Sequence, residues 1–222
     1  MTRETARQAA EAGVDFVSPK SFLSRVYYKM FGGTHLVNRA GLARTFQNIR
    51  LFKEMSVLEN LLVSLHPERG YALPSALLRL PPFNKGEKQI RDKAMEILKR
   101  LDLEKVADVP SKSLPYGAQR KVEIARALAT DPKLLLLDEP AAGMNPTETA
   151  QLSDHISHIR EDFKVTVLLI EHDMSLVMKI CEQIHVLDYG ELIASGVPAE
   201  IRNNPRVIEA YLGGSLGEVK HA

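Results

Sequence analysis

Residues 134–139 read Leu-Leu-Leu-Leu-Asp-Glu, an apolar run that ends in two adjacent carboxylates. A short, wholly apolar run of this kind is typical of a buried strand in a parallel sheet. Ligands of open α/β sheets bind beyond the carboxyl ends of the strands. Carboxylates at that edge can hold Mg²⁺ and can position or activate a water molecule. Asp138 and Glu139 are therefore the first candidate site residues, and the alternative is a strand that runs into an acidic turn.

A second apolar run, rich in β-branched residues, spans residues 165–170 and is followed by Glu171-His172-Asp173. If its strand lies beside the first one, His172 lies near Glu139 and can hydrogen-bond a terminal phosphate. A lone histidine is more often structural. Its position after a second strand end favours a functional role instead.

Helical periodicity separates these strands. It predicts helices over residues 121–130, 147–161 and 175–182, and short strands at 184–187 and 192–194 predict a hairpin. Strands that alternate with helices indicate an α/β fold, with a parallel sheet covered by helices on both faces.

The N-terminal half has weaker patterns. Ser56 is a candidate N-cap, with Glu59 as its capping-box partner. Residues 87–103 predict an amphipathic helix whose charged side chains form a solvated face. Residues 2–12 resemble a short polar helix, and the proline-punctuated stretch 71–83 predicts a loop with a short helix.

The composition excludes several classes. Of the 222 residues, 45% are hydrophobic and 26% charged, which is ordinary for a globular protein. The net charge of +1 gives no support for nucleic-acid binding. One cysteine permits no disulfide within the chain. No apolar run approaches the roughly 20 residues of a membrane span, and the polar start does not resemble a secretory signal, so we expect any membrane link to run through a partner protein.

Two further stretches carry weaker signals on their own. Residues 114–119, Leu-Pro-Tyr-Gly-Ala-Gln, precede a helix expected at 120–130, where free backbone amides and the helix dipole favour an anion. Gln47 lies in the stretch 44–48, Arg-Thr-Phe-Gln-Asn. A glutamine oxygen can ligate a metal or orient a water molecule.

Together these motifs carry a strong resemblance. Along the chain they are Gln47, Tyr116-Gly117, Asp138-Glu139 and His172. Their order and spacing resemble the Q-loop, signature motif, Walker B motif and H-loop of ABC-type ATPases, and the link at 122–133 is especially specific to that superfamily. We call residues 44–48 the Q-loop segment. The resemblance covers residues 38–214. It implies an ABC-type P-loop NTPase fold, a parallel α/β sheet with a helical subdomain.

A narrower resemblance concerns the transported substrate. Residues 45–52, 139–146, 201–205 and 210–213 resemble the ATP-binding subunit of high-affinity branched-chain amino acid importers, the LivG/BraF group. Residues 16–39 resemble an insertion found before the Q-loop in some of these proteins.

The resemblance also implies roles for individual residues. Glu139 is the general base or orients the water, Asp138 reaches Mg²⁺, and His172 contacts the γ-phosphate of ATP. Gln47 senses the metal and water and couples the site to the membrane subunits.

ABC ATPases work as head-to-tail pairs, so further residues face the partner's nucleotide. The resemblance assigns Tyr116, Gly117, Ala118 and Gln119 to the ATP of the opposite subunit. Asn145 belongs to residues 143–146, which correspond to the D-loop at the dimer interface. The resemblance implies that Asn145 also binds nucleotide.

The sequence departs from the family pattern in one major respect. It has no match to the phosphate-binding pattern G-x-x-x-x-G-K-[ST]. The decoy at residues 13–21 lacks the second glycine, and Pro19 has no N–H to donate. Pro115 and Ala118 also replace a serine and a glutamine that are common in the signature, which we interpret as tuning. We expect this chain alone to hydrolyse little ATP, and to expose apolar sheet surface that makes it unstable or prone to aggregation.

These observations divide the chain into four parts. Residues 1–43 form an atypical N-terminal segment or insertion, and 44–113 hold the Q-loop and a helical subdomain. Residues 114–196 hold the signature, Walker B and H-loop, and 197–222 form a tail of the branched-chain importer type.

The favoured function is the ATP-hydrolysing subunit of a branched-chain amino acid importer, in a truncated form without its own P-loop. Its cofactors are ATP and Mg²⁺. Its partners are membrane permease subunits, a second ABC ATPase and, indirectly, a periplasmic or extracellular amino-acid-binding protein. It is placed at the cytoplasmic face of the plasma (inner) membrane, and no nucleic acid is expected. One alternative is a non-catalytic half-site subunit that pairs with an intact ATPase; another is a soluble ABC protein of DNA repair or translation, which usually carries long insertions.

Overall fold

The structure is a computed structural model, and part of the chain lies outside the residues that it describes. The expected helix at 2–12 and nearly all of the insertion at 16–39 fall outside, as does most of the loop at 71–83. The described residues are 38, 40–66, 77–78 and 81–212.

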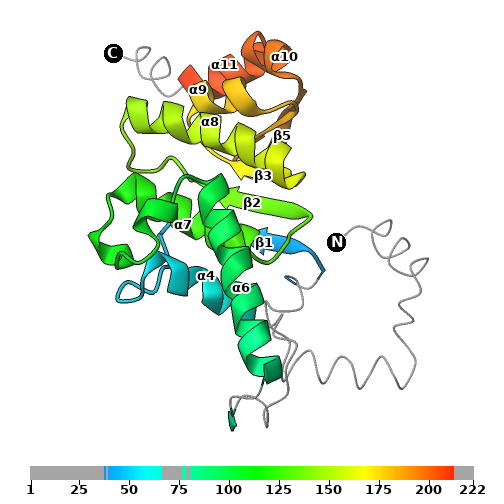
Figure 1. Ribbon diagram of the computed structural model, residues 1–222. Helices are drawn as coiled ribbons and strands as arrows, with labels where there is room; N and C mark the ends of the chain where they lie inside the picture. Colours follow the sequence, from blue (N-terminus) through cyan, green and yellow to red (C-terminus); the bar gives the residue numbers. More distant parts are fainter. Residues whose placement is uncertain (1–37, 39, 67–76, 79–80, 213–222) are drawn as a thin grey trace, which may run out of the picture.

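A parallel sheet forms the centre of the described fold. Its strand order is β1 (Leu42–Arg44), β2 (Leu134–Asp138) and β3 (Thr166–Ile170). In Figure 1 the sheet lies between α4, α6 and α7 below and α8 to α11 above. The parallel arrangement of β2 beside β3 confirms the prediction from their apolar runs. β1 was not expected, because three residues are too few to show a period.

The two faces of the sheet differ. Leu135 and Leu137 of β2 are fully buried, and Ala43 of β1 is also buried. On β3, Leu168 and Ile170 each remain 47% exposed. Within the described residues, the expectation of a sheet covered on both faces is therefore wrong at β3. The separate expectation that the sheet exposes apolar surface is confirmed at Leu168 and Ile170.

Helix α4 (Val57–Leu65) begins at the predicted cap. Ser56 Oγ accepts from the backbone N–H of Glu59 at 3.2 Å, and Glu59 Oε2 accepts from the N–H of Ser56 at 2.8 Å. This reciprocal capping box satisfies two otherwise unpaired donors at the helix start.

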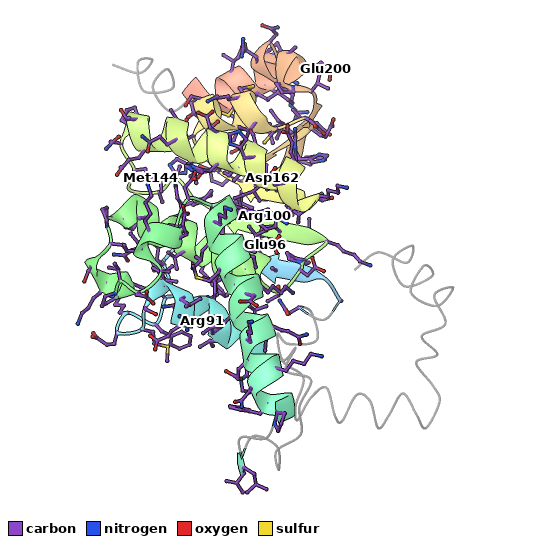
Figure 2. The ribbon with its side chains drawn as sticks, in the orientation of Figure 1. Arg91, Glu96, Arg100, Met144, Asp162 and Glu200 are labelled. Atoms are coloured by element: carbon purple, nitrogen blue, oxygen red, sulfur yellow. The ribbon has the colours of Figure 1, made fainter. Side chains whose placement is uncertain are left out.

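Helix α6 (Pro81–Arg100) begins earlier than the predicted 87–103. Proline is well suited to a first helical turn, where its missing N–H has no intrahelical partner to lose. Ile90, Ala94 and Ile97 are buried, as the amphipathic pattern predicted. Arg100 and Glu96 form an ion pair on the exposed side (Figure 2). The 3₁₀ turns η2 (Glu104–Val106) and η3 (Ser111–Ser113) then lead toward α7.

Three helices complete the main core. They are α7 (Tyr116–Leu128), α8 (Pro146–Phe163) and α9 (Met174–Ile180). Their buried apolar residues, Ile124, Ile156 and Leu176 among them, join those of β2, α4 and α6 in one cluster.

The C-terminal part has a smaller core of its own. Strands β4 (Ile184–Asp188) and β5 (Glu191–Gly196) form the predicted hairpin. Its turn residues Tyr189 and Gly190 both have positive φ, 44° and 83°, as a two-residue turn of type I′ requires. Helices α10 (Pro198–Arg202) and α11 (Pro205–Leu212) pack beside it. No helix in the described residues combines the length and apolarity needed to cross a membrane.

Candidate functional site

Three of the predicted site residues meet at the carboxyl edge of the sheet. Gln47 Nε2 donates to Glu139 Oε2 at 2.5 Å. His172 Nδ1 lies 3.8 Å from Glu139 Oε1 on the other side. The His172 side chain is 76% exposed and that of Glu139 is 31% exposed, so both are open to a ligand. The prediction that neighbouring strands bring His172 close to Glu139 is confirmed.

The register of the sheet produces this meeting. Asp138 pairs with Ile170 across β2 and β3, and the N–H of Glu139 donates to Ile170 O at 2.9 Å. Glu139 also has a φ of +41°, a left-handed conformation that few non-glycine residues adopt. Backbone strain of this kind clusters at functional sites. It turns the chain sharply after β2 and presents the carboxylate at the edge.

Asp138 has a partner that sequence reasoning did not identify. Arg44 Nη2 donates to Asp138 Oδ2 at 2.6 Å, and the Asp138 side chain is 22% exposed. The pairing follows from register, because β1 lies next to β2 and Arg44 is its last residue. The only sequence signal was that the Q-loop segment begins with a basic residue, Arg44.

Glu171 is a second residue that the sequence analysis missed. Its carboxylate is 1% exposed and accepts from the N–H of Ala141 at 2.9 Å and of His172 at 3.2 Å. His172 Nδ1 lies 3.7 Å from Glu171 Oε2. Glu171 therefore ties the turn after β2 to the turn after β3 and places His172 between two carboxylates.

The start of the helix after His172 holds the loop that carries this residue. Asp173 is the N-cap of α9, and its Oδ1 accepts from Ser175 Oγ at 2.6 Å and from the N–H groups of Ser175 at 2.9 Å and Leu176 at 3.4 Å. These bonds, first of all the one from the Ser175 hydroxyl, lower the pKa of Asp173 below its ordinary value. Tyr211 of α11 donates to the carbonyl oxygen of His172 at 3.1 Å, so the C-terminal helix also holds the loop.

The signature residues form a separate part of the surface. Pro115 is the N-cap of α7 and provides no side-chain hydrogen bond, so the first-turn amides at Gly117 and Ala118 have no side-chain cap within the part of the chain that the structure describes. Gln119 Nε2 donates to Leu114 O at 2.8 Å. Its amide is thereby turned toward its own chain, and contact of these residues with nucleotide stays a prediction.

The side chains of Tyr116 and Asn145 both make hydrogen bonds in or next to the D-loop segment, residues 143–146. Tyr116 OH donates to Ala142 O at 3.1 Å, which joins the signature to the chain before the D-loop. Asn145 is the N-cap of α8, with a capping box to Glu148 at 3.0 Å in both directions. Figure 2 shows Met144 at the turn that leads into this helix. The side-chain oxygen of Asn145 thus has a structural function, and its contact with nucleotide is untested.

The donor set at the sheet edge fits Mg²⁺. Asp138 and Glu139 offer carboxylate oxygens, and Gln47 offers an amide oxygen beside them. Magnesium prefers oxygen ligands and is usually held by one or two carboxylates together with substrate phosphates.

Comparison with known families agrees with this geometry. The profile described as ABC transporter matches residues 28–142. A second profile, described as branched-chain amino acid ATP-binding cassette transporter, matches residues 191–216. The first match includes the Q-loop segment, the signature and the Walker B carboxylates.

Similar proteins point the same way. The high-affinity branched-chain amino acid transport ATP-binding protein LivG of Escherichia coli (strain K12) is 46% identical over 200 residues, which is 84% of this chain and 78% of that protein. BraF of Pseudomonas aeruginosa, which carries the same description, is 47% identical over 179 residues, covering 81% of this chain and 70% of BraF. The solved structure of the ADP conformation of MJ1267, an ATP-binding cassette of an ABC transporter, superposes with a TM-score of 0.65 at 32% identity, over 80% of this chain and 70% of that one. With this identity, this coverage and the site geometry described above, the chain belongs to the ABC transporter ATP-binding proteins of the branched-chain amino acid, LivG/BraF type.

Proposed function

We propose that this chain powers the import of branched-chain amino acids by turning over ATP at the edge of its sheet, in a head-to-tail pair with a second ABC ATPase. The pair acts on membrane permease subunits from the cytoplasmic face of the membrane. A periplasmic or extracellular binding protein delivers the amino acid. The observation that carries the proposal is the meeting of Gln47, Glu139 and His172 at one edge of the sheet, in a chain of this family.

Glu139 is the residue best placed to orient or deprotonate the attacking water. It follows β2 directly, is partly exposed, and is held by the Gln47 amide. His172 is exposed on the other side of the same carboxylate, where its ring can hydrogen-bond the terminal phosphate. Mg²⁺ would be held by Asp138 and Gln47 and would neutralise charge on the phosphates. Arg44, which forms an ion pair with Asp138, provides a positive charge at the same edge of the sheet.

The first turn of α7 has a different place in this proposal. Its uncapped amides at Gly117 and Ala118 face an anion favourably because of the helix dipole. In a head-to-tail pair that anion is the terminal phosphate of ATP bound to the opposite subunit. The D-loop at 143–146 would then lie at the subunit interface.

The phosphate cradle is the one required part that these 222 residues do not contain as a sequence pattern. In one arrangement, a P-loop elsewhere in the same native polypeptide supplies the cradle beside Glu139. In the other, the chain is a half-site subunit that offers only its signature helix to ATP held by the P-loop of the paired subunit. The intact mass and N-terminal sequence of the native protein distinguish them. A mass clearly above 24.8 kDa with a P-loop upstream supports the first arrangement, and a native chain that begins at Met1 supports a half-site subunit.

ATP hydrolysis by the assembled transporter tests the catalytic part of the proposal. Glu139→Gln keeps the size of the side chain but removes the base, so we expect hydrolysis to fall by about 10²–10⁴-fold while nucleotide binding persists. Glu161→Gln, on the exposed face of α8, is the matched control and should leave the rate unchanged. Equal rates in the two variants would refute Glu139 as the base.

A further inference from the structure

Helix α7 carries a buried ion pair that the proposed mechanism does not use. Arg120 and Glu123 lie one turn apart, with side chains 0% and 2% exposed, and Arg120 Nη1 lies 2.7 Å from Glu123 Oε2. A buried charged pair is expensive to desolvate and is weak evidence for stability. Arginine is almost never fully buried unless it is well paired. The role of Arg120 is therefore inferred from the other groups that it contacts.

These contacts reach the backbone on both sides of the Gln47 side chain. Arg120 Nη1 donates to Phe46 O at 2.7 Å, and Nη2 donates to Gln47 O at 2.7 Å. Glu123 Oε1 accepts from the N–H of Arg50 at 3.1 Å. The planar guanidinium presents its donors in a rigid fork, so one side chain spans two successive carbonyls. The pair thus fixes the position of the Q-loop segment relative to α7.

The same guanidinium continues toward the start of α7. Arg120 Nη2 donates to Tyr116 OH at 3.3 Å, and Tyr116 OH donates to Ala142 O at 3.1 Å. At the other end, Gln47 Nε2 donates to Glu139. A continuous series of hydrogen bonds therefore joins the chain before the D-loop, the signature helix, the Q-loop segment and the candidate base.

We propose that Arg120, together with Glu123, is a positioning residue that transmits the position of the signature helix to Gln47 and so to Glu139. When the first turn of α7 engages the nucleotide of the paired subunit, the fork moves the carbonyls of Phe46 and Gln47 with it. The Gln47 amide then changes its distance from the Glu139 carboxylate. The inference rests on the proposed function, and it adds the link between the two halves of the nucleotide site.

The test separates this role from a purely structural one. Removing one member of a buried pair leaves an unpaired charge, whereas replacing both by apolar residues of similar volume is often neutral for stability. We therefore compare Arg120→Met/Glu123→Leu with the parent in the assembled transporter. The double variant leaves no unpaired buried charge, so it should fold, but Phe46 O, Gln47 O and the N–H of Arg50 lose their partners and the melting temperature should fall. Amide exchange in residues 45–51 should rise at least about tenfold, the effect of losing one hydrogen bond to a charged group.

The second measurement in this test is the stimulation of ATP hydrolysis by the amino-acid-loaded binding protein. We expect the double variant to lose this stimulation at least tenfold. Lys121→Met is the matched control, because it removes the neighbouring cation of α7. Among the described residues, the hydrogen bonds from this helix to Phe46 O and Gln47 O come from Arg120 and not from Lys121. It should leave both exchange and stimulation unchanged.

A further variant decides the matter if the double variant does not fold. Arg120→Lys keeps a charge beside Glu123, but one compact ammonium cannot span both carbonyls. It should fold and still show faster exchange and weaker stimulation. A folded variant of either kind with parental exchange and stimulation would overturn the proposal. If the parent transporter itself shows no stimulation, the proposed function fails, and the exchange measurement, which uses no ATP, still decides whether Arg120 positions the Q-loop segment.

Discussion

The side-chain amide of Gln47 donates a 2.5 Å hydrogen bond to the carboxylate of Glu139, although the two residues are 92 positions apart. The bond joins the segment after β1 to the residue after β2. It gives the candidate base one fixed partner and leaves its other oxygen facing His172. A change at any of these three residues should therefore affect turnover more than folding.

Gln47→Leu should uncouple the site without preventing nucleotide binding. Leucine has a similar size but can neither hold Glu139 nor offer an oxygen to a metal. We expect ATP hydrolysis by the assembled transporter to fall by about tenfold, the effect of losing one hydrogen bond to a charged group. Nucleotide affinity, measured by titration, should change little. Gln151→Leu, on an exposed face of α8, is the control, and an equal loss in both variants would contradict the account.

His172→Ala should lower turnover because the terminal phosphate loses a hydrogen-bond partner. A loss of about 10²-fold is expected for a side chain that stabilises the transition state. His158→Ala, exposed on α8, provides a matched control that should be neutral. Rates are compared at saturating ATP. Similar rates in both variants would mean that His172 lies near Glu139 without contributing to the reaction.

Much of this site could be anticipated because local sequence determines it. The apolar runs at 134–137 and 165–170 predict neighbouring strands, and parallel strands bring their ends together. The approach of His172 to Glu139 follows from that geometry alone. Capping at Ser56 was equally local, since it depends on a residue three positions away.

The missed features depend on partners far away in the sequence. Arg120 reaches carbonyls 73 and 74 positions away, and Arg44 reaches Asp138 across 94 positions. Every residue has a backbone carbonyl, so a sequence pattern cannot predict which carbonyls Arg120 will bind. An Arg–Glu pair at i, i+3 among apolar residues of α7 was the one available signal.

Asn60 should be important for stability rather than for activity. Its side chain is fully buried and bonds Phe52 O at 3.1 Å, Ser111 Oγ at 2.9 Å and the N–H of Phe52 at 2.9 Å. Asn60→Ala leaves these groups unpaired and should cost about 2 kcal/mol of unfolding free energy. Urea unfolding measures the change. Val63→Ala on the exposed side of α4 should cost at most about 0.5 kcal/mol, and comparable losses would contradict this role.

Asp173 should make stability depend on pH in the acid range. Its pKa is lower in the folded protein than the ordinary value of 3.8, so its ionised form stabilises the folded state. This contribution is fully present above that ordinary value and is lost as pH falls through the lowered pKa. Asp173→Asn keeps a cap but does not titrate. The difference in urea midpoint between parent and variant should be constant from pH 7 to about pH 5 and shrink below about pH 4; a difference that grows on acidification would contradict the assignment.

Uptake of radiolabelled leucine tests the central claim most directly. The native ATPase subunit, its permease and its paired ATPase are reconstituted in vesicles with the amino-acid-binding protein outside and ATP inside. We expect leucine to accumulate with the parent subunit and with Glu161→Gln, and to fall to background with Glu139→Gln. Accumulation that is equal with Glu139→Gln, or that does not depend on ATP, would contradict the account.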